Sequence, residues 1–334
     1  MKRFFAVLLA LCLLAGCGPR LDRFPRVEAQ APAYAPQTLT IDVPRDADQT
    51  ALDGVSQLAA AVLDLSGGAV TLEVIPSQDP ASALLHGATH LALVDSARLV
   101  EAEPSLSFLE WPFLAESADQ WLTVMGEEDG AVRGNLPLRK ALGGEVIGLW
   151  YGGRTVLLCR SSFYESIGFA GTSLGVLSDR GGAEFFQGIG EDLEAKVLCL
   201  GTAEELAELF DQKEIKYAEY PLDALDPDAL PEELKYLEDT AHRVEGLWLV
   251  LGEGVDEDTA RLLRAAAASV PQTVLDARTR REEELFRALE DRDIEVRRGD
   301  YAALRRAARD YFRRNGESLG CDHRTLDRLM GLVG

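Results

Sequence analysis

Hydrophobic and polar residues alternate where the folded part of the chain should begin, and then change to helical spacing. Residues 38–43 alternate, residues 52–62 place apolar side chains on one helical face, and residues 70–74 alternate again. Gly67-Gly68 ends the helical pattern. This strand–helix–strand unit is typical of a parallel sheet, with a right-handed crossover expected.

Further apolar segments predict more strands, many of them separated by helical stretches. The segments are 90–94, 145–151, 155–160, 172–177, 195–200, 215–218 and 247–251. The predicted fold class is therefore α/β.

Two helical patterns follow these strands. The first runs from Asp256 to about Asp291, and Pro271 predicts a kink in it because proline removes an amide donor and crowds the preceding turn. In the second, Asp300 can cap the start of a last helix and Gly316 can end it.

The N-terminus carries a targeting pattern. Lys2 and Arg3 precede an apolar run, residues 4–14, that is too short to remain as a membrane-spanning helix. The run ends in Leu14-Ala15-Gly16-Cys17, which predicts a lipoprotein signal peptide over residues 1–17 with the lipid on Cys17. The alternative is an ordinary secretory signal in which Cys17 is incidental.

Chain length and net charge limit the size of the folded body and the kinds of partner it can bind. Residues 18–37 contain four prolines and suit a tether, which leaves about 295 residues, enough for two lobes. The formal charge of −22 becomes −24 once Lys2 and Arg3 are removed (−22 − 2), which argues against nucleic-acid binding. Such acidity should also keep the protein off an anionic membrane except through its lipid.

Cysteine, histidine and serine patterns give weaker signals. Cys159, Cys199 and Cys321 show no framework and are expected to be buried thiols, with a Cys159–Cys199 bridge as the alternative. The pair His86 and His90 has metal-ligand spacing on a helix, but Gly87 lies between them, so no metal or cofactor is predicted.

A serine-hydrolase pattern is also present. Gly171-Thr172-Ser173-Leu174-Gly175 matches a nucleophile elbow, with Asp179 and His242 following in the order that such enzymes use. An elbow needs a strand before the serine, whereas here the apolar stretch follows it, so hydrolysis is the less favoured alternative.

Charged and aromatic residues stand at predicted strand ends. They are Asp95 and Arg98, then Arg154, then Glu219 and Tyr220. Ligands of open α/β sheets bind beyond such ends, and the planar fork of arginine suits a carboxylate.

Together these segments resemble the substrate-binding subunits of tripartite ATP-independent periplasmic (TRAP) transporters, the dicarboxylate- and sialic-acid-binding family. The likeness lies in the order and spacing of several short motifs along the whole body of the chain. The motifs are Ser66-Gly67-Gly68, Asp95-Ser96-Ala97-Arg98, Leu109-Glu110-Trp111-Pro112-Phe113-Leu114, Gly153-Arg154, residues 215–222 and Thr240-Ala241-His242.

The resemblance implies a two-lobed periplasmic-binding-protein (Venus flytrap) fold in which the long kinked helix braces both lobes. Lobe I would comprise residues 38–150 plus roughly 245–284, and lobe II residues 151–243 plus roughly 285–334. Ligand would bind in the cleft between the lobes, and closure would remove it from water.

For the ligand, the resemblance implies a small organic anion gripped chiefly by Arg154, with Asp95, Arg98, Glu219 and Tyr220 lining the cleft. Two positions depart from the family pattern: Gly175 replaces its second arginine and Tyr220 replaces an asparagine. Arg180 is the one nearby residue that could replace the missing fork.

The function implied is that of a non-enzymatic, lipid-anchored, extracytoplasmic monomer that hands a small organic acid to the membrane subunits of a TRAP-type transporter. The alternative within the same fold is a sensor or scaffold lipoprotein with no transport role.

Overall fold

The computed structural model describes residues 34–115, 117–127, 130–161, 171–177, 186–188, 196–200 and 202–332, all within one structural unit that begins at Tyr34. The predicted signal peptide, Cys17 and most of the tether lie outside the described residues, as do Asp179 and Arg180. No helix in the described ranges combines the length and the apolar character needed to cross a bilayer.

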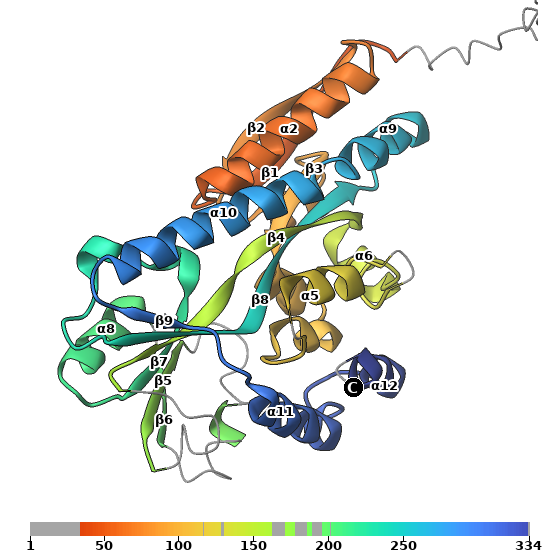
Figure 1. Ribbon diagram of the computed structural model, residues 1–334. Helices are drawn as coiled ribbons and strands as arrows, with labels where there is room; N and C mark the ends of the chain where they lie inside the picture. The colour runs from red at the N-terminus through yellow and green to blue at the C-terminus, as the bar shows by residue number, and fades with distance from the viewer. Residues whose placement is uncertain are drawn as a thin grey trace, which may run out of the picture. The chain divides into compact units, whose positions relative to one another are not determined.

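The described strands form one nine-stranded mixed sheet (Figure 1) in the order β2-β1-β3-β8-β4-β7-β5-β6, with β9 paired to β8. Their bounds are β1 Gln37–Pro44, β2 Val70–Ser77, β3 Leu91–Asp95, β4 Gly144–Cys159, β5 Ser173–Leu177, β6 Lys196–Leu200, β7 Tyr217–Pro221, β8 Tyr236–Gly252 and β9 Glu295–Arg297. The groups β2-β1-β3 and β7-β5-β6 are parallel. Antiparallel pairing of β4 with β8 joins these two groups, which confirms the α/β class and the two-lobed architecture.

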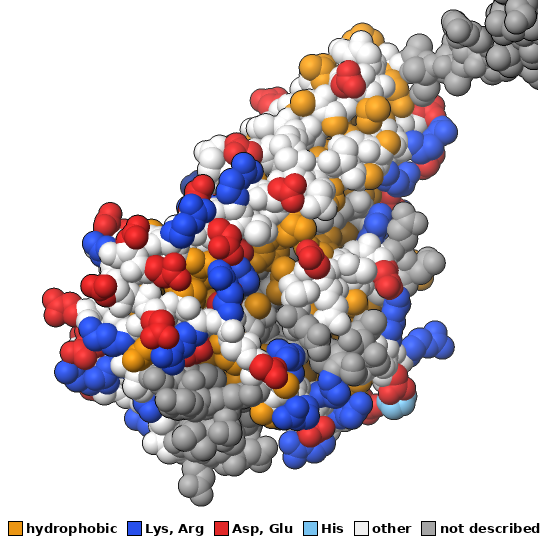
Figure 2. Space-filling view, in the orientation of Figure 1, with side chains coloured by type: hydrophobic (Ala, Val, Ile, Leu, Met, Phe, Trp, Pro, Cys, Tyr) orange, Lys and Arg blue, Asp and Glu red, His pale blue; other side chains and the backbone are white. Residues whose placement is uncertain are grey.

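Helices surround this sheet. The α-helices are α2 Gln49–Leu65, α3 Pro80–Leu85, α4 Ser96–Ala102, α5 Ala118–Met125, α6 Leu136–Leu142, α8 Ala203–Asp211, α9 Glu257–Ala267, α10 Pro271–Glu290, α11 Ala302–Asn315 and α12 His323–Leu332. Three 3₁₀ segments are η2 Pro104–Glu110, η3 Leu222–Ala224 and η4 Pro227–Ala229. On the face shown in Figure 2, the described Lys and Arg side chains are interspersed with Asp and Glu.

The first strand–helix–strand unit forms as its pattern predicts. The Asp48 carboxylate accepts the Ala51 amide at 2.9 Å and caps α2, whose apolar face is buried. Gly67 and Gly68 end the helix with φ of 63° and 87°, a left-handed conformation that glycine adopts without strain.

The long kinked helix is confirmed as two helices, α9 and α10. Asp256 caps α9 through the Thr259 amide, and Pro271 occupies the first turn of α10, where its missing amide is not needed. Figure 1 shows α10 running beside α2 and over β4, and α10 contacts both. Because α10 also contacts η4, this helix touches elements of both halves of the chain.

The central strands are longer than their sequence predicts. Segments 145–151 and 155–160 are one strand, β4, because Gly152 and Gly153 form a β-bulge instead of a break. A Cβ at Gly152 would lie 3.0 Å from the Glu245 carbonyl oxygen, and Gly153 has φ of 129°. The strand predicted at 247–251 begins eleven residues earlier, at Tyr236 (247 − 236), and β9 was missed.

The C-terminal helices pack on residues that the sequence assigns to lobe I. The rings of Trp111 and Phe312 stack at 4.2 Å, and the Ser107 hydroxyl donates to the Leu319 carbonyl at 2.6 Å. Gly316 follows α11, as expected, but the N-cap of this helix is Tyr301 and not Asp300, whose carboxylate accepts the Ala302 amide at 3.0 Å from one residue further out. The exact lobe boundaries stay a prediction.

The three cysteines within the described ranges are free thiols. Cys159 and Cys321 are buried, as predicted, whereas Cys199 is exposed and the expectation for it was wrong. Cys199 lies on β6, which ends the order of the described strands, so one edge of β6 pairs with no described strand.

A buried arginine ties α10 to both halves of the sheet. The Arg278 side chain is 2% exposed; its Nη1 contacts Asp48 and lies 3.6 Å from Asp223 Oδ2 in η3. Asp48 precedes α2 in the first half, whereas Asp223 follows β7 in the second. Arg278 is thus an ionic link between segments far apart in the sequence.

We expect Arg278→Met to lower the free energy of unfolding by roughly 2 kcal/mol, less than for a wholly buried pair because both carboxylates remain partly exposed. The exposed Arg281 of the same helix supplies the control, Arg281→Met. Urea unfolding of both variants measures the difference, and an equal loss in the two would contradict the role assigned to Arg278.

Candidate functional site

A bulge of four residues interrupts β8 at the centre of the sheet. Thr155 pairs with Arg243 and Leu157 with Glu238, so four residues of β8, from Asp239 to His242, lie opposite Val156 alone. Within the bulge Ala241 has φ of 44°. Such non-glycine backbone costs about 1–3 kcal/mol and concentrates at functional sites.

The bulge is held by a segment from the first half of the chain. Phe113 also has a left-handed backbone, with φ of 58°, and its amide donates to the His242 carbonyl oxygen. Two strained residues therefore meet at His242, which marks this position as a candidate site.

Four ionisable side chains converge there and form what we call the Glu219 cluster: Glu110, Glu219, His242 and Arg243. Arg243 Nη2 lies 3.1 Å from Glu219 Oε1, and Arg243 Nη1 lies 3.8 Å from Glu110 Oε2. His242 Nε2 is 3.3 Å from Glu219 Oε1. Side-chain exposure is 2% or less for all but Glu110, at 14%.

The cluster draws on both halves of the protein. Glu110 ends η2 in the first half, Glu219 lies on β7 in the second, and His242 and Arg243 lie on the crossing strand β8. A ligand bound at these groups would contact both halves at once, as binding between two lobes requires.

Aromatic and hydroxyl side chains enclose the cluster. The rings of Phe113 and Phe186 lie 5.4 and 5.7 Å from the His242 ring. Thr155 Oγ1 lies 3.4 Å from Arg243 Nε, and Thr240 Oγ1 is 2.5 Å from His242 Nδ1. Excluding water in this way strengthens each charged contact inside.

Burial lowers the pKa of His242 below its ordinary value, although the hydrogen bond to Glu219 opposes the shift. His242 is therefore neutral at pH 7. The cluster then contains one formal cation, Arg243, beside two carboxylates, and it offers both hydrogen-bond donors and acceptors.

Arg154, the predicted anion contact, belongs to a separate cluster that faces α10. Its Nη1 lies 3.2 Å from Asp239 Oδ2, and its Nη2 lies 3.0 Å from Glu282 Oε2. Tyr151 donates its hydroxyl to Glu282 at 2.7 Å, and the Phe286 ring lies 5.3 Å from the Arg154 guanidinium carbon. Two carboxylates already occupy this guanidinium fork.

The other predicted site residues are dispersed. The Asp95 carboxylate accepts the Arg98 amide at 2.8 Å and caps α4, and the Arg98 guanidinium pairs with Glu101 at 2.6 Å. Tyr220 packs against the core of the second half. The structure thus places Glu219 in the Glu219 cluster and the other four residues in different surroundings, and their role as ligand contacts stays a prediction.

Two residues of the cluster were missed from the sequence. Arg243 directly follows the Thr240-Ala241-His242 motif, and Glu110 lies inside the Leu-Glu-Trp-Pro motif, so both carried a positional signal. Their pairing depends on the bulge in β8, which the sequence pattern does not reveal.

The hydrolase and metal alternatives find no support in the geometry. Ser173 opens β5, so the strand follows the serine, and its hydroxyl donates to the Glu214 carbonyl at 2.7 Å. His90 Nδ1 lies 3.0 Å from the Thr40 hydroxyl. The described residues contain no group of three or more side chains arranged to hold a metal ion.

A buried neutral histidine makes stability depend on pH. Because the folded-state pKa of His242 lies below 6.5, the unfolded chain takes up a proton that the folded protein refuses. This part of the stability is present above pH 6.5 and is lost as the pH falls through that value. In urea unfolding between pH 7.5 and about pH 5.5, His242→Gln should lose less stability than the wild type. An identical pH dependence would contradict the neutral, buried state.

Comparisons with known proteins were made by sequence and by structure. No family model matches the chain, and no curated protein matches it by sequence. Similar solved structures are TRAP periplasmic solute-binding proteins.

The one from Ochrobactrum anthropi has a TM-score of 0.76 and 17% identity and covers 90% of this chain and 95% of its own. The protein from Rhodobacter sphaeroides, in an open apo state, has a TM-score of 0.77 and 16% identity, and the match covers 89% of this chain and 98% of that protein. The protein from Desulfovibrio salexigens, with bound orotic acid, has a TM-score of 0.66 and 17% identity, and the match covers 89% of this chain and 97% of that protein. The chain therefore has the two-lobed fold of the TRAP periplasmic solute-binding proteins.

Proposed function

We propose that this chain is a lipid-anchored, extracytoplasmic solute-binding protein that binds a small organic acid and delivers it to a TRAP-type membrane transporter. The fold it shares with such proteins over about nine-tenths of its length supports this proposal. Proteins of similar structure hold orotic acid, galactonate and L-gulonate. The pattern at Cys17 supports the lipid anchor and an extracytoplasmic location.

The single observation that carries the proposal is the Glu219 cluster. Its position between the two halves, its burial and the strained backbone at Phe113 and Ala241 are all expected of a ligand site. The Arg243 guanidinium can bind a ligand carboxylate through Nη1, which lies 3.8 Å from Glu110 Oε2 and is therefore beyond hydrogen-bond distance of that carboxylate. Glu110 and Glu219 can accept hydrogen bonds from ligand hydroxyl groups. This combination suits a hydroxy acid better than a simple dicarboxylate, whose second charge would meet two glutamates.

Ligand class is tested by a thermal-shift screen with galactonate, L-gulonate, orotate and succinate, and with galactitol as a neutral match to galactonate. A ligand stabilises the folded protein by RT ln(1 + [L]/Kd), so the preferred class gives the largest rise in Tm. We expect hydroxy acids to exceed both succinate and galactitol. Equal shifts for galactonate and galactitol would contradict recognition of an acid.

The anion contact is tested by calorimetric titration of the best ligand against three conservative variants. Lysine keeps the charge, and so keeps the neighbouring carboxylates neutralised, but lacks the bidentate fork. We expect Arg243→Lys to weaken binding by about tenfold or more, since hydrogen bonds to charged groups are strong.

Two matched variants complete that titration. Arg139 is an exposed arginine that also contacts two carboxylates, Glu145 and Glu253, so Arg139→Lys should leave affinity unchanged. Arg154→Lys distinguishes the two clusters as the site of the anion contact. If Arg154→Lys lowers ligand affinity and Arg243→Lys does not, the contact is Arg154, as the sequence predicts. That result would overturn the role given to the Glu219 cluster.

The anchor is tested at Cys17. Cys17→Ser removes the thiol that would carry the lipid, and it should release the protein from membranes into the soluble fraction with the ligand affinity of the wild type. The measurement is fractionation followed by titration. Continued membrane association of the variant would contradict the lipid anchor.

A further inference from the structure

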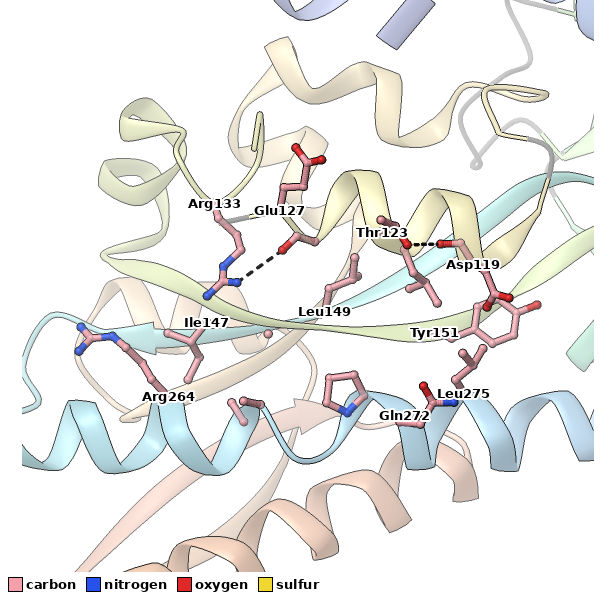
Figure 3. Close-up of a pocket in the computed structure, with 16 residues that line it drawn as sticks. Asp119, Thr123, Glu127, Arg133, Ile147, Leu149, Tyr151, Arg264, Gln272 and Leu275 are labelled. Atoms are coloured by element: carbon pink, nitrogen blue, oxygen red, sulfur yellow. Dashed lines mark hydrogen bonds between the residues drawn. The ribbon is translucent and has the colours of Figure 1, made fainter. Parts of the chain in front are cut away.

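A cavity lies away from the Glu219 cluster. It has a volume of about 690 Å³ and is bounded by α5, by residues 147–151 of β4 and by the junction of α9 with α10 (Figure 3). This volume is within the range of small-molecule sites. None of the five site residues predicted from the sequence lines it.

The middle of the cavity is apolar. Ile147 and Leu149 of β4 are buried and line it, together with Ala267 and Leu275 from the two helices. Gly148 lies between the first two and adds no side chain to fill the space. This surface suits an apolar body.

One end of the cavity is cationic, because Figure 3 shows Arg133 and Arg264 at the same end. Their surroundings differ. Arg264 is held by Glu145, at 2.6 Å from Nε, and by Glu257, at 3.2 Å from Nη1. Its charge is therefore compensated within the protein.

Among the described residues, the partners of Arg133 are backbone carbonyls. Its Nε donates to the Val146 carbonyl at 3.3 Å, and its Nη1 reaches the Gly126 carbonyl at 3.5 Å, at the long limit for a hydrogen bond. Within the described ranges, no carboxylate forms an ion pair with Arg133. In contrast, the nearby Glu127 is paired with Arg328.

Arg133 thus differs from Arg154, Arg243 and Arg278, each of which lies between two carboxylates. In a chain of net charge −22, Arg133 is a half-buried arginine that forms no ion pair with any carboxylate of the described residues. A planar fork in this setting fits a single carboxylate with two parallel hydrogen bonds.

The opposite end of the cavity is polar, with Asp119, Thr123 and Gln272 around the buried Tyr151 ring. The Thr123 hydroxyl donates to the Asp119 backbone carbonyl at 2.8 Å. The Asp119 carboxylate disfavours a second acidic group here. At the Arg133 end the Glu127 carboxylate is paired with Arg328, so the charge distribution admits one anionic group, held by Arg133.

We propose that this cavity is a second binding site, for an amphipathic monocarboxylic acid whose carboxylate is held by Arg133 and whose apolar body lies against Ile147, Leu149 and Leu275. The site is separate from the Glu219 cluster and does not depend on the transport role. It would give the protein a second small-molecule ligand.

Octanoate is the probe, and 1-octanol is its neutral match with the same apolar chain. Calorimetric titration should show saturable octanoate binding at least about tenfold tighter than octanol binding, because the alcohol cannot form the charge-assisted pair. Arg133→Gln should remove that difference. Arg243→Lys, in the other cluster, should leave octanoate affinity unchanged.

A surface pair of variants tests the location without touching Arg133. Ala268→Trp adds bulk at the cavity wall, just after α9 ends, whereas Ala265→Trp adds the same bulk at an exposed position of α9 outside the cavity. We expect octanoate binding to weaken in Ala268→Trp only. The proposal is overturned if octanoate does not bind saturably, if Arg133→Gln binds octanoate as the wild type does, or if both tryptophan variants behave alike.

Discussion

The structure depends on the antiparallel pairing of β4 with β8. These two strands connect the parallel group β2-β1-β3 to the parallel group β7-β5-β6, so every other strand takes its place relative to this pair. The pairing is interrupted by bulges, because Gly152 and Gly153 permit one and the segment from Asp239 to His242 forms another. In a regular ladder the side chains of both strands would alternate between the two faces of the sheet. The bulges instead place Arg154 toward α10 and Arg243 toward η2.

Charge is distributed around this pair in a repeated arrangement. Arg154, Arg243 and Arg278 are each largely buried between two carboxylates, and each joins segments that are distant in sequence. Removing one partner of such a group leaves a buried charge uncompensated, so these contacts favour one arrangement of the elements over others. Some of the many acidic residues of this chain therefore have a structural role, because they pair with the buried arginines inside the protein.

The sequence predicted the elements whose patterns are local. The helix capped by Asp48 and ended by Gly67, the break at Pro271 and the α/β class follow from spacing, capping and backbone preference. The β-bulges were not predictable, because Gly152-Gly153 has the same local signature as a chain break. The same limitation affected the site: Glu219 was identified, but its partner Arg243 is brought to it by long-range pairing that no local pattern encodes.

A crystal structure of the protein with its best hydroxy-acid ligand tests the central claim most directly. If the Glu219 cluster is the ligand site, the ligand carboxylate will lie within hydrogen-bond distance of the Arg243 guanidinium, about 2.7–3.0 Å, with the Phe113 and Phe186 rings around it. A ligand bound to Arg154 on the α10 side, or confined to the cavity beside Arg133, would contradict this assignment.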